Sequence, residues 1–175
     1  MKHNAARHVC FEEASLAGTR PEREKAGLLP ERRASDDLPQ ERSARRPADI
    51  WLPRGPSDHP EALDFAITSA MRFPLIREAS ATPELVFARY EQHKRDHQHT
   101  AQQCEQAGIR FIPIIMEAHS GSWSPLARSM LDWIARQRAA ITLEEPATVS
   151  LRIAQRLFAS LHRENSRAIL KRLVA

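Results

Sequence analysis

Two short apolar segments between residues 45 and 68 constrain the fold most, because each alternates with the period of a β-strand. They read ADIWLP and ALDFAITS, and the loop that joins them, PRGPSDHPE, is rich in proline. Ile50 and Leu52 fall on one side of the first segment, and Leu63 and Phe65 share a face of the second. This alternation predicts two strands joined by a hairpin or a wide turn.

Each predicted strand carries one carboxylate, Asp49 in the first and Asp64 in the second. Acidic residues are depleted inside strands, and burying them is costly unless something binds them. The small residues Ala66 and Thr68 share the face of Asp64 and leave room for a ligand. The two carboxylates therefore predict a shared ligand, with a divalent cation as the first candidate. The alternative is that each aspartate caps a turn at a strand end.

A helix and a third strand are predicted downstream. Thr82 is a typical N-cap, Pro83 suits the first helical position, and the helical pattern continues to about Gln106, before Gly108. Its predicted inner face consists of Val86, Tyr90, His97, Ala101 and Cys104. The apolar run IRFIPIIME then predicts a strand buried on both faces, in which Pro113 indicates a bulge or an edge position. Strand, helix and strand in this order predict a crossover and a mixed sheet.

The two ends of the chain differ in character. Residues 1 to about 17 predict a helix that Gly18 ends, and a charged, proline-rich segment follows. Ser124 and Pro125 pair an N-cap with a first-turn proline, which predicts a helix before a last one that runs to about Leu173. On the last helix, the residues that can face a core are Ile153, Ala154, Leu157, Leu161, Ile169 and Leu170.

We therefore predict an α/β fold with a small mixed sheet flanked by helices, a flexible N-terminal lead-in and a C-terminal helical pair. The predicted units are residues 1–44 (the lead-in), 45–122 (the α/β core) and 123–175 (the helical extension).

The core also resembles a known nuclease family. Its first strand begins with Arg46-Pro47-Ala48-Asp49, its second reads Leu63-Asp64-Phe65-Ala66-Ile67-Thr68, and the following helix carries Tyr90 and Lys94. These residues resemble the restriction-endonuclease-like domain found after the reverse transcriptase of some non-LTR retrotransposons, which belongs to the PD-(D/E)XK nuclease group. The resemblance covers residues 45–122.

The resemblance implies a magnesium-dependent endonuclease-like domain that hydrolyses DNA phosphodiester bonds. Asp49 and Asp64 would hold Mg²⁺, and Lys94 would orient the attacking water or stabilise the developing charge. Tyr90 would fix the lysine or contact a phosphate, and Glu117 would support or ligate the metal. Ordinary strand-end and surface roles for these residues are the competing interpretation.

Two features depart from the family pattern. Ala48 is inserted before Asp49, and Ala66 stands where a lysine would follow Asp64, so the catalytic lysine would have to come from the helix as Lys94. The sequence also contains no polymerase domain. The resemblance thus implies a separated, decayed piece of an element whose missing partner is a reverse transcriptase module.

Basic residues, most of them on the last helix, predict a second DNA-binding surface. The formal net charge is +4, carried largely by arginine, whose planar fork matches phosphate geometry. The predicted DNA contacts are Arg46, Arg152, Arg156, Arg163, Arg167 and Lys171. An ordinary solvated face is the alternative for these positions. A non-catalytic nucleic-acid-binding or interaction module with the same fold is the rival function.

The cysteines and histidines carry less information. Two cysteines make no disulfide framework, which favours an intracellular rather than a secreted protein, and only the retroelement resemblance implies a nuclear location. His93 and His97 lie four residues apart on the predicted helix, but without a clear third ligand they do not predict a zinc site.

Overall fold

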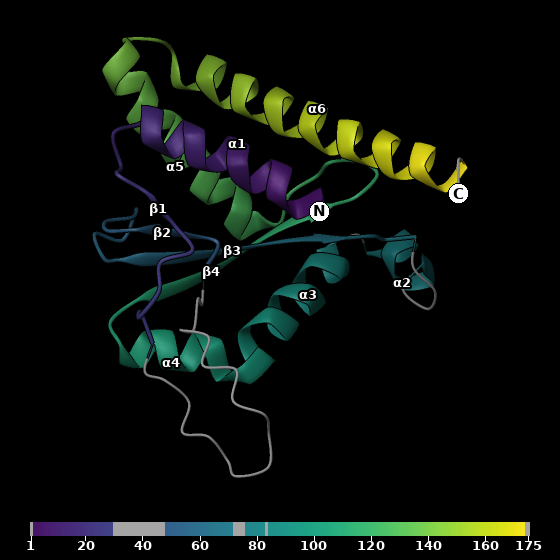
Figure 1. Ribbon diagram of the computed structural model, residues 1–175, viewed down its shortest axis with the longest axis horizontal. Helices are drawn as coiled ribbons and strands as arrows, with labels where there is room; N and C mark the ends of the chain where they lie inside the picture. Colours follow the sequence, from purple (N-terminus) through teal and green to yellow (C-terminus); the bar gives the residue numbers. More distant parts are fainter. Residues whose placement is uncertain (1, 30–47, 72–75, 83, 174–175) are drawn as a thin grey trace.

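The structure, a computed structural model, describes residues 2–29, 48–71, 76–82 and 84–173. In these residues a four-stranded mixed sheet lies between two groups of helices, as Figure 1 shows. The strands are β1(Glu22–Arg23), β2(Ile50–Leu52), β3(Glu61–Thr68) and β4(Arg110–Glu117). The helices are α1(Lys2–Leu16), α2(Ile76–Ala81), α3(Glu84–Asp96), the 3₁₀ turn η1(His97–His99), α4(Thr100–Gln106), α5(Pro125–Thr142) and α6(Pro146–Leu173).

The sheet has the order β1-β2-β3-β4. Strands β2 and β3 are antiparallel with Ile50 opposite Leu63, and β3 and β4 are parallel with Asp64 opposite Pro113. These pairings confirm the predicted turn between the first two strands and the predicted mixed sheet. Because β4 is the last strand in this order, Pro113 lies at the edge position expected from its missing N–H.

Helices α1, α5 and α6 cover one face of the sheet (Figure 1). The apolar face of β3 that contains Leu63 and Phe65 packs into this main core, together with Ile50 and Leu52 of β2. Helix α1 contributes mainly small residues, which are Ala6, Val9, Cys10 and Ala14, and Ala17 follows directly after the helix. Residues assigned by sequence to the lead-in, the α/β core and the helical extension thus share one core, while the proposed unit boundaries stay a prediction.

The N-terminal region is more ordered than its composition suggested. Helix α1 ends at Leu16 and Gly18 has a φ of 70°, which confirms the predicted helix and its end. Beyond it, Glu22 and Arg23 pair with β2, and the side chain of Leu29 is buried. The rest of the predicted mobile segment, residues 30–44, lies outside the described residues.

The opposite face of the sheet is covered by α3 and α4, which the sequence predicted as one continuous helix. The helix is interrupted at η1, where His99 adopts a left-handed backbone with a φ of 55°. The change of direction lets Cys104 pack with Ala62 and Phe111. The side chain of His97, predicted to face the core, is exposed.

The C-terminal helices match their predicted signals, with one difference at the end. The Ser124 hydroxyl caps α5 by accepting a hydrogen bond of 3.4 Å from the Ala127 N–H. Leu161 is fully buried on α6, but Ala154, also predicted to face the core, is exposed, and Ile169 and Leu170 are each 59% exposed. The expectation that the last two face the core was wrong, because the end of α6 extends beyond α1 (Figure 1). No helix among the described residues is both long and apolar enough to cross a membrane.

Candidate active site

Asp64 and Lys94 meet on the face of the sheet that α3 covers. Asp64 lies in the middle of β3, on the side opposite to Leu63 and Phe65, and Lys94 lies in the last turn of α3. The Lys94 Nζ donates a hydrogen bond of 2.8 Å to Asp64 Oδ2. Both side chains are about three-quarters buried, at 23% and 22% exposed, so water screens the ion pair only partly. The helix therefore supplies the lysine that the strand lacks.

Asp49 lies directly across from Asp64. Its N–H donates a 2.9 Å hydrogen bond to the Leu63 carbonyl, and its Oδ2 accepts one of 2.8 Å from the Phe65 N–H. Asp49 thus bonds to both residues that flank Asp64, so the two aspartates occupy neighbouring positions on adjacent chain segments. The structure thus brings Asp64 and Lys94 together and places Asp49 on the adjacent segment, with its carboxylate bonded to Arg7 of α1 and to the Phe65 N–H.

The carboxylate of Asp49 has a cation of its own. Arg7 of α1 donates a hydrogen bond of 3.0 Å to Asp49 Oδ1 and a second, of 2.5 Å, to Glu24. Burial disfavours the charged guanidinium, but the hydrogen bonds and charges of Glu24 and Asp49 outweigh it and raise the pKa of Arg7. Sequence reasoning missed Arg7 and Glu24, because nothing local marks a residue 42 positions away as a partner of Asp49.

Tyr90 lies one helical turn before Lys94 and is partly buried. Its ring packs with Ala66, Phe87 and Ile115 between α3 and the sheet. The ring also meets that of His93 edge-on, with 5.8 Å between the centroids. These contacts can hold α3 against the sheet at the height where Lys94 reaches Asp64.

Glu117 lies apart from this site. The register places it beside Thr68, four residues along β3 from Asp64, which corresponds to roughly 13 Å at the usual rise of a strand. Its carboxylate accepts hydrogen bonds from the N–H groups of Ala70 (3.2 Å), His119 (2.8 Å) and Ser120 (2.6 Å). Although burial opposes ionisation, these bonds and the Ser120 hydroxyl hold the pKa of Glu117 below its ordinary value. Glu117 therefore stabilises the segments that follow β3 and β4.

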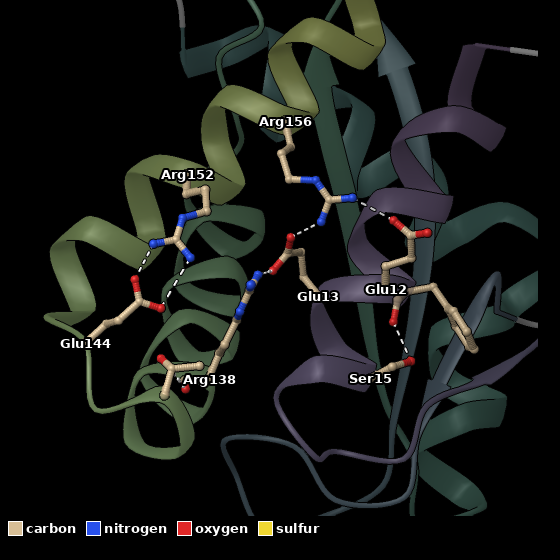
Figure 2. A network of polar contacts seen from close by, with 9 residues as sticks. Glu12, Glu13, Ser15, Arg138, Glu144, Arg152 and Arg156 are labelled. Carbon is tan, nitrogen blue, oxygen red and sulfur yellow. Dashed lines mark hydrogen bonds and ion pairs between the residues drawn. The ribbon is translucent and has the colours of Figure 1, made fainter.

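The predicted DNA-binding residues fall into different environments. Arg152 forms a two-pronged ion pair with Glu144, as Figure 2 shows, and Arg156 bonds to Glu12 and Glu13 of α1. Arg167 pairs with Glu164 at 2.5 Å, while Arg163 and Lys171 are exposed. Arg46 lies outside the described residues. The basic stripe is thus partly neutralised within the protein.

Other metal-binding arrangements are limited. The rings of His93 and His97 lie 6.1 Å apart between centroids, and both are exposed. Across the ranges that the structure describes, no group of three or more His, Cys, Asp or Glu side chains is placed to hold a metal ion.

No family model, curated protein or solved structure matches this chain. The functional proposal therefore depends on the geometry of the site and on the sequence motifs.

Proposed function

We propose that this chain is a nuclease-like domain that hydrolyses DNA phosphodiester bonds, with magnesium held by Asp49 and Asp64 and with Lys94 as the cation beside the reacting phosphate. The observation that carries the proposal is the 2.8 Å contact between Lys94 and Asp64. This contact joins a carboxylate of a strand to a lysine of the crossover helix. The family resemblance led us to expect this arrangement, because Ala66 stands where the family pattern has a lysine.

Asp49 and Asp64 are the residues that would hold magnesium. Mg²⁺ is commonly bound by one or two carboxylates together with water and substrate phosphates, and Asp49 would have to exchange its hydrogen bond from Arg7 for the ion. When bound, the ion would polarise the phosphate and lower the pKa of a coordinated water.

Side chains of the protein would stabilise the developing charge and position the reacting groups. Lys94 is a compact cation that can stabilise negative charge developing on the phosphate oxygens, and its partial burial strengthens that interaction. Asp64 orients the ammonium group, and Tyr90 supports the segment of α3 that carries it.

Nicking of supercoiled plasmid in the presence of Mg²⁺ tests this function. We expect Asp64→Ala and Lys94→Met each to lower the nicking rate by about 10²-fold or more, the usual loss when one preorganised charged group is removed. Asp58→Asn is the matched control, because Asp58 is an exposed loop carboxylate that pairs only with Arg54 among the described residues. Parent-like nicking by Asp64→Ala would show that this site is not catalytic.

A non-catalytic DNA-binding module is the second candidate, and one observation favours it. Both oxygens of Asp49 already accept hydrogen bonds, from Arg7 and from the Phe65 N–H. An internal guanidinium thus neutralises the carboxylate that a metal would use. Under this alternative, the parent protein binds DNA but does not nick plasmid at any Mg²⁺ concentration.

A further inference from the structure

An open pocket of about 830 Å³ lies beside the candidate active site, near the start of β3 and β4. It is bounded by the loop between β2 and β3, the end of α3, η1, α4 and the first residues of β4. The polar side chains that matter here are Ser57, His59, Arg95, His99, Gln102 and Arg110. The volume is in the range of pockets that take a small organic ligand.

The lining of this pocket combines two arginines with two carboxylates, Asp96 and Glu105. Within the described parts of the chain, Arg95 and Gln102 form no side-chain hydrogen bond or ion pair with the protein. Of the two acidic residues in the lining, Asp96 accepts a 2.8 Å hydrogen bond from Gln92, whereas Glu105 is exposed on α4. The Arg95 guanidinium thus suits an anionic oxygen of a ligand, and the Gln102 amide can donate or accept a hydrogen bond.

A buried carboxylate supports the floor of the pocket. Glu61 is fully buried at the start of β3, accepts a 2.9 Å hydrogen bond from the Ser57 hydroxyl and lies 3.5 Å from the Arg110 guanidinium. Its Oε2 has no partner among the described residues. Glu61 therefore positions the Ser57 hydroxyl and the Arg110 guanidinium of the lining. Because Glu61 belongs to β3, the sheet fixes this side of the pocket.

Helix α3 contributes one residue to the candidate active site and the next residue to the pocket. Lys94 and Arg95 are consecutive residues of its last turn, and Lys94 reaches Asp64 whereas Arg95 lines the pocket. On β3, Asp64 lies two residues, or roughly 7 Å, from Ala62, whose neighbour on β4 is Phe111 of the pocket lining. A nucleic-acid strand, in which one phosphate follows another, can therefore occupy the pocket and the Asp64–Lys94 site together.

We propose that the pocket binds one unpaired nucleotide of a DNA strand, next to the phosphodiester held at Asp64 and Lys94. The inference rests on the proposed function and adds a substrate class, which is single-stranded or locally unpaired DNA. Arginine forks recognise phosphate oxygens, and a base can enter a pocket of this size only when it is out of its stack and its pair. Intact duplex should therefore bind less tightly.

Fluorescence anisotropy without Mg²⁺ measures binding separately from cleavage. The probes are a labelled single-stranded ten-nucleotide DNA and the duplex with the same sequence. We expect the parent to prefer the single strand, and Arg95→Ala to weaken single-strand binding about tenfold, the loss for one charge-assisted hydrogen bond. Gln102→Trp, which fills the pocket from an exposed position, should have a similar effect.

Arg136→Ala is the matched control, since Arg136 is an exposed arginine on α5, which covers the other face of the sheet. We expect it to bind both probes as the parent does. Equal affinity of the parent for single strand and duplex, or parent-like binding by both pocket variants, would overturn the proposal. Thermal unfolding of each variant checks that the fold is retained.

The nicking assay separates this failure from failure of the proposed function. If the parent nicks plasmid but the pocket variants bind the single strand normally, the pocket proposal fails and the nuclease function stands. If the parent never nicks but prefers the single strand through Arg95, the catalytic function fails and the pocket assignment stands.

Discussion

The carboxylate of Asp64 accepts a hydrogen bond from a lysine, whereas that of Glu117 accepts three from backbone N–H groups. The first kind of partner is a flexible side chain that can exchange a carboxylate for a phosphate. The second kind belongs to the backbone and cannot leave unless the segments that follow β3 and β4 open. These partners therefore favour chemistry at Asp64 and a structural role at Glu117.

Glu117 should contribute stability that depends on pH. Its lowered pKa means that the ionised form stabilises the folded state above the ordinary carboxyl pKa, and that this contribution is lost as the pH falls through the folded value. We expect Glu117→Gln to lower the free energy of unfolding at pH 7 by about 1–3 kcal/mol, because charge-assisted hydrogen bonds are removed. The difference from the parent should shrink near pH 3 in urea titrations.

Glu105→Gln is the control for this series, because the Glu105 side chain is exposed on α4. The same substitution there should change the free energy of unfolding by less than about 0.5 kcal/mol at either pH. A Glu117→Gln effect that is as large near pH 3 as at pH 7 would contradict the role assigned to the ionised carboxylate.

At the scale of elements, α1 is joined to α5 and α6 by a polar network of carboxylates and arginines (Figure 2). The fully buried carboxylate of Glu13 accepts hydrogen bonds from Arg138 of α5 and Arg156 of α6. Arg156 also donates a 2.7 Å hydrogen bond to the neighbouring Glu12. Because α1 offers mainly small apolar side chains, this network supplies contacts that its apolar face cannot.

Removing the central carboxylate should destabilise the packing of α1. We expect Glu13→Ala to lower the free energy of unfolding by about 3–5 kcal/mol, since it leaves the guanidinium groups of Arg138 and Arg156 partly buried without their partner. Glu12→Ala, one residue away and 40% exposed in its side chain, should cost less than about 1 kcal/mol. Urea unfolding measures both, and equal losses would contradict the central role of Glu13.

At the scale of the whole molecule, the basic charge of α6 is most available on the far half of this helix. Arg152 pairs with Glu144 in the turn before α6, and Arg156 joins α6 to α1. Arg163 and Lys171 are exposed, and Arg167 pairs only with Glu164 one turn earlier among the described residues. If α6 contacts DNA, the contact should therefore involve the far half of the helix.

A salt titration of DNA binding tests this surface. We expect the triple variant Arg163→Ala, Arg167→Ala and Lys171→Ala to weaken binding and to reduce the slope of log K against log[salt] by up to about 3, at roughly 0.9 for each phosphate that is no longer neutralised. The triple variant Arg77→Ala, Arg128→Ala and Arg136→Ala removes the same charge from exposed positions on α2 and α5. Equal slopes for the two variants would mean that only overall charge matters.

Local signals in the sequence predicted most of the elements. The alternation around Ile50 and Leu63, the proline at the sheet edge and the Ser124 cap all act over a few residues, so one sequence suffices to recognise them. The break at His99 was missed, because a left-handed residue other than glycine carries no strong sequence signal and is stabilised by packing of the helices on each side.

The sequence by itself thus determined strands β2, β3 and β4, the Ser124 cap and the identity of the candidate carboxylates. Only the tertiary structure decided which cation each carboxylate meets, because the pairs are far apart along the chain. Lys94 is 30 residues from Asp64, Arg7 is 42 from Asp49, and Arg156 is 143 from Glu13. Such pairs form only where packing brings their elements together, since in the unfolded chain their mutual attraction is weak in water.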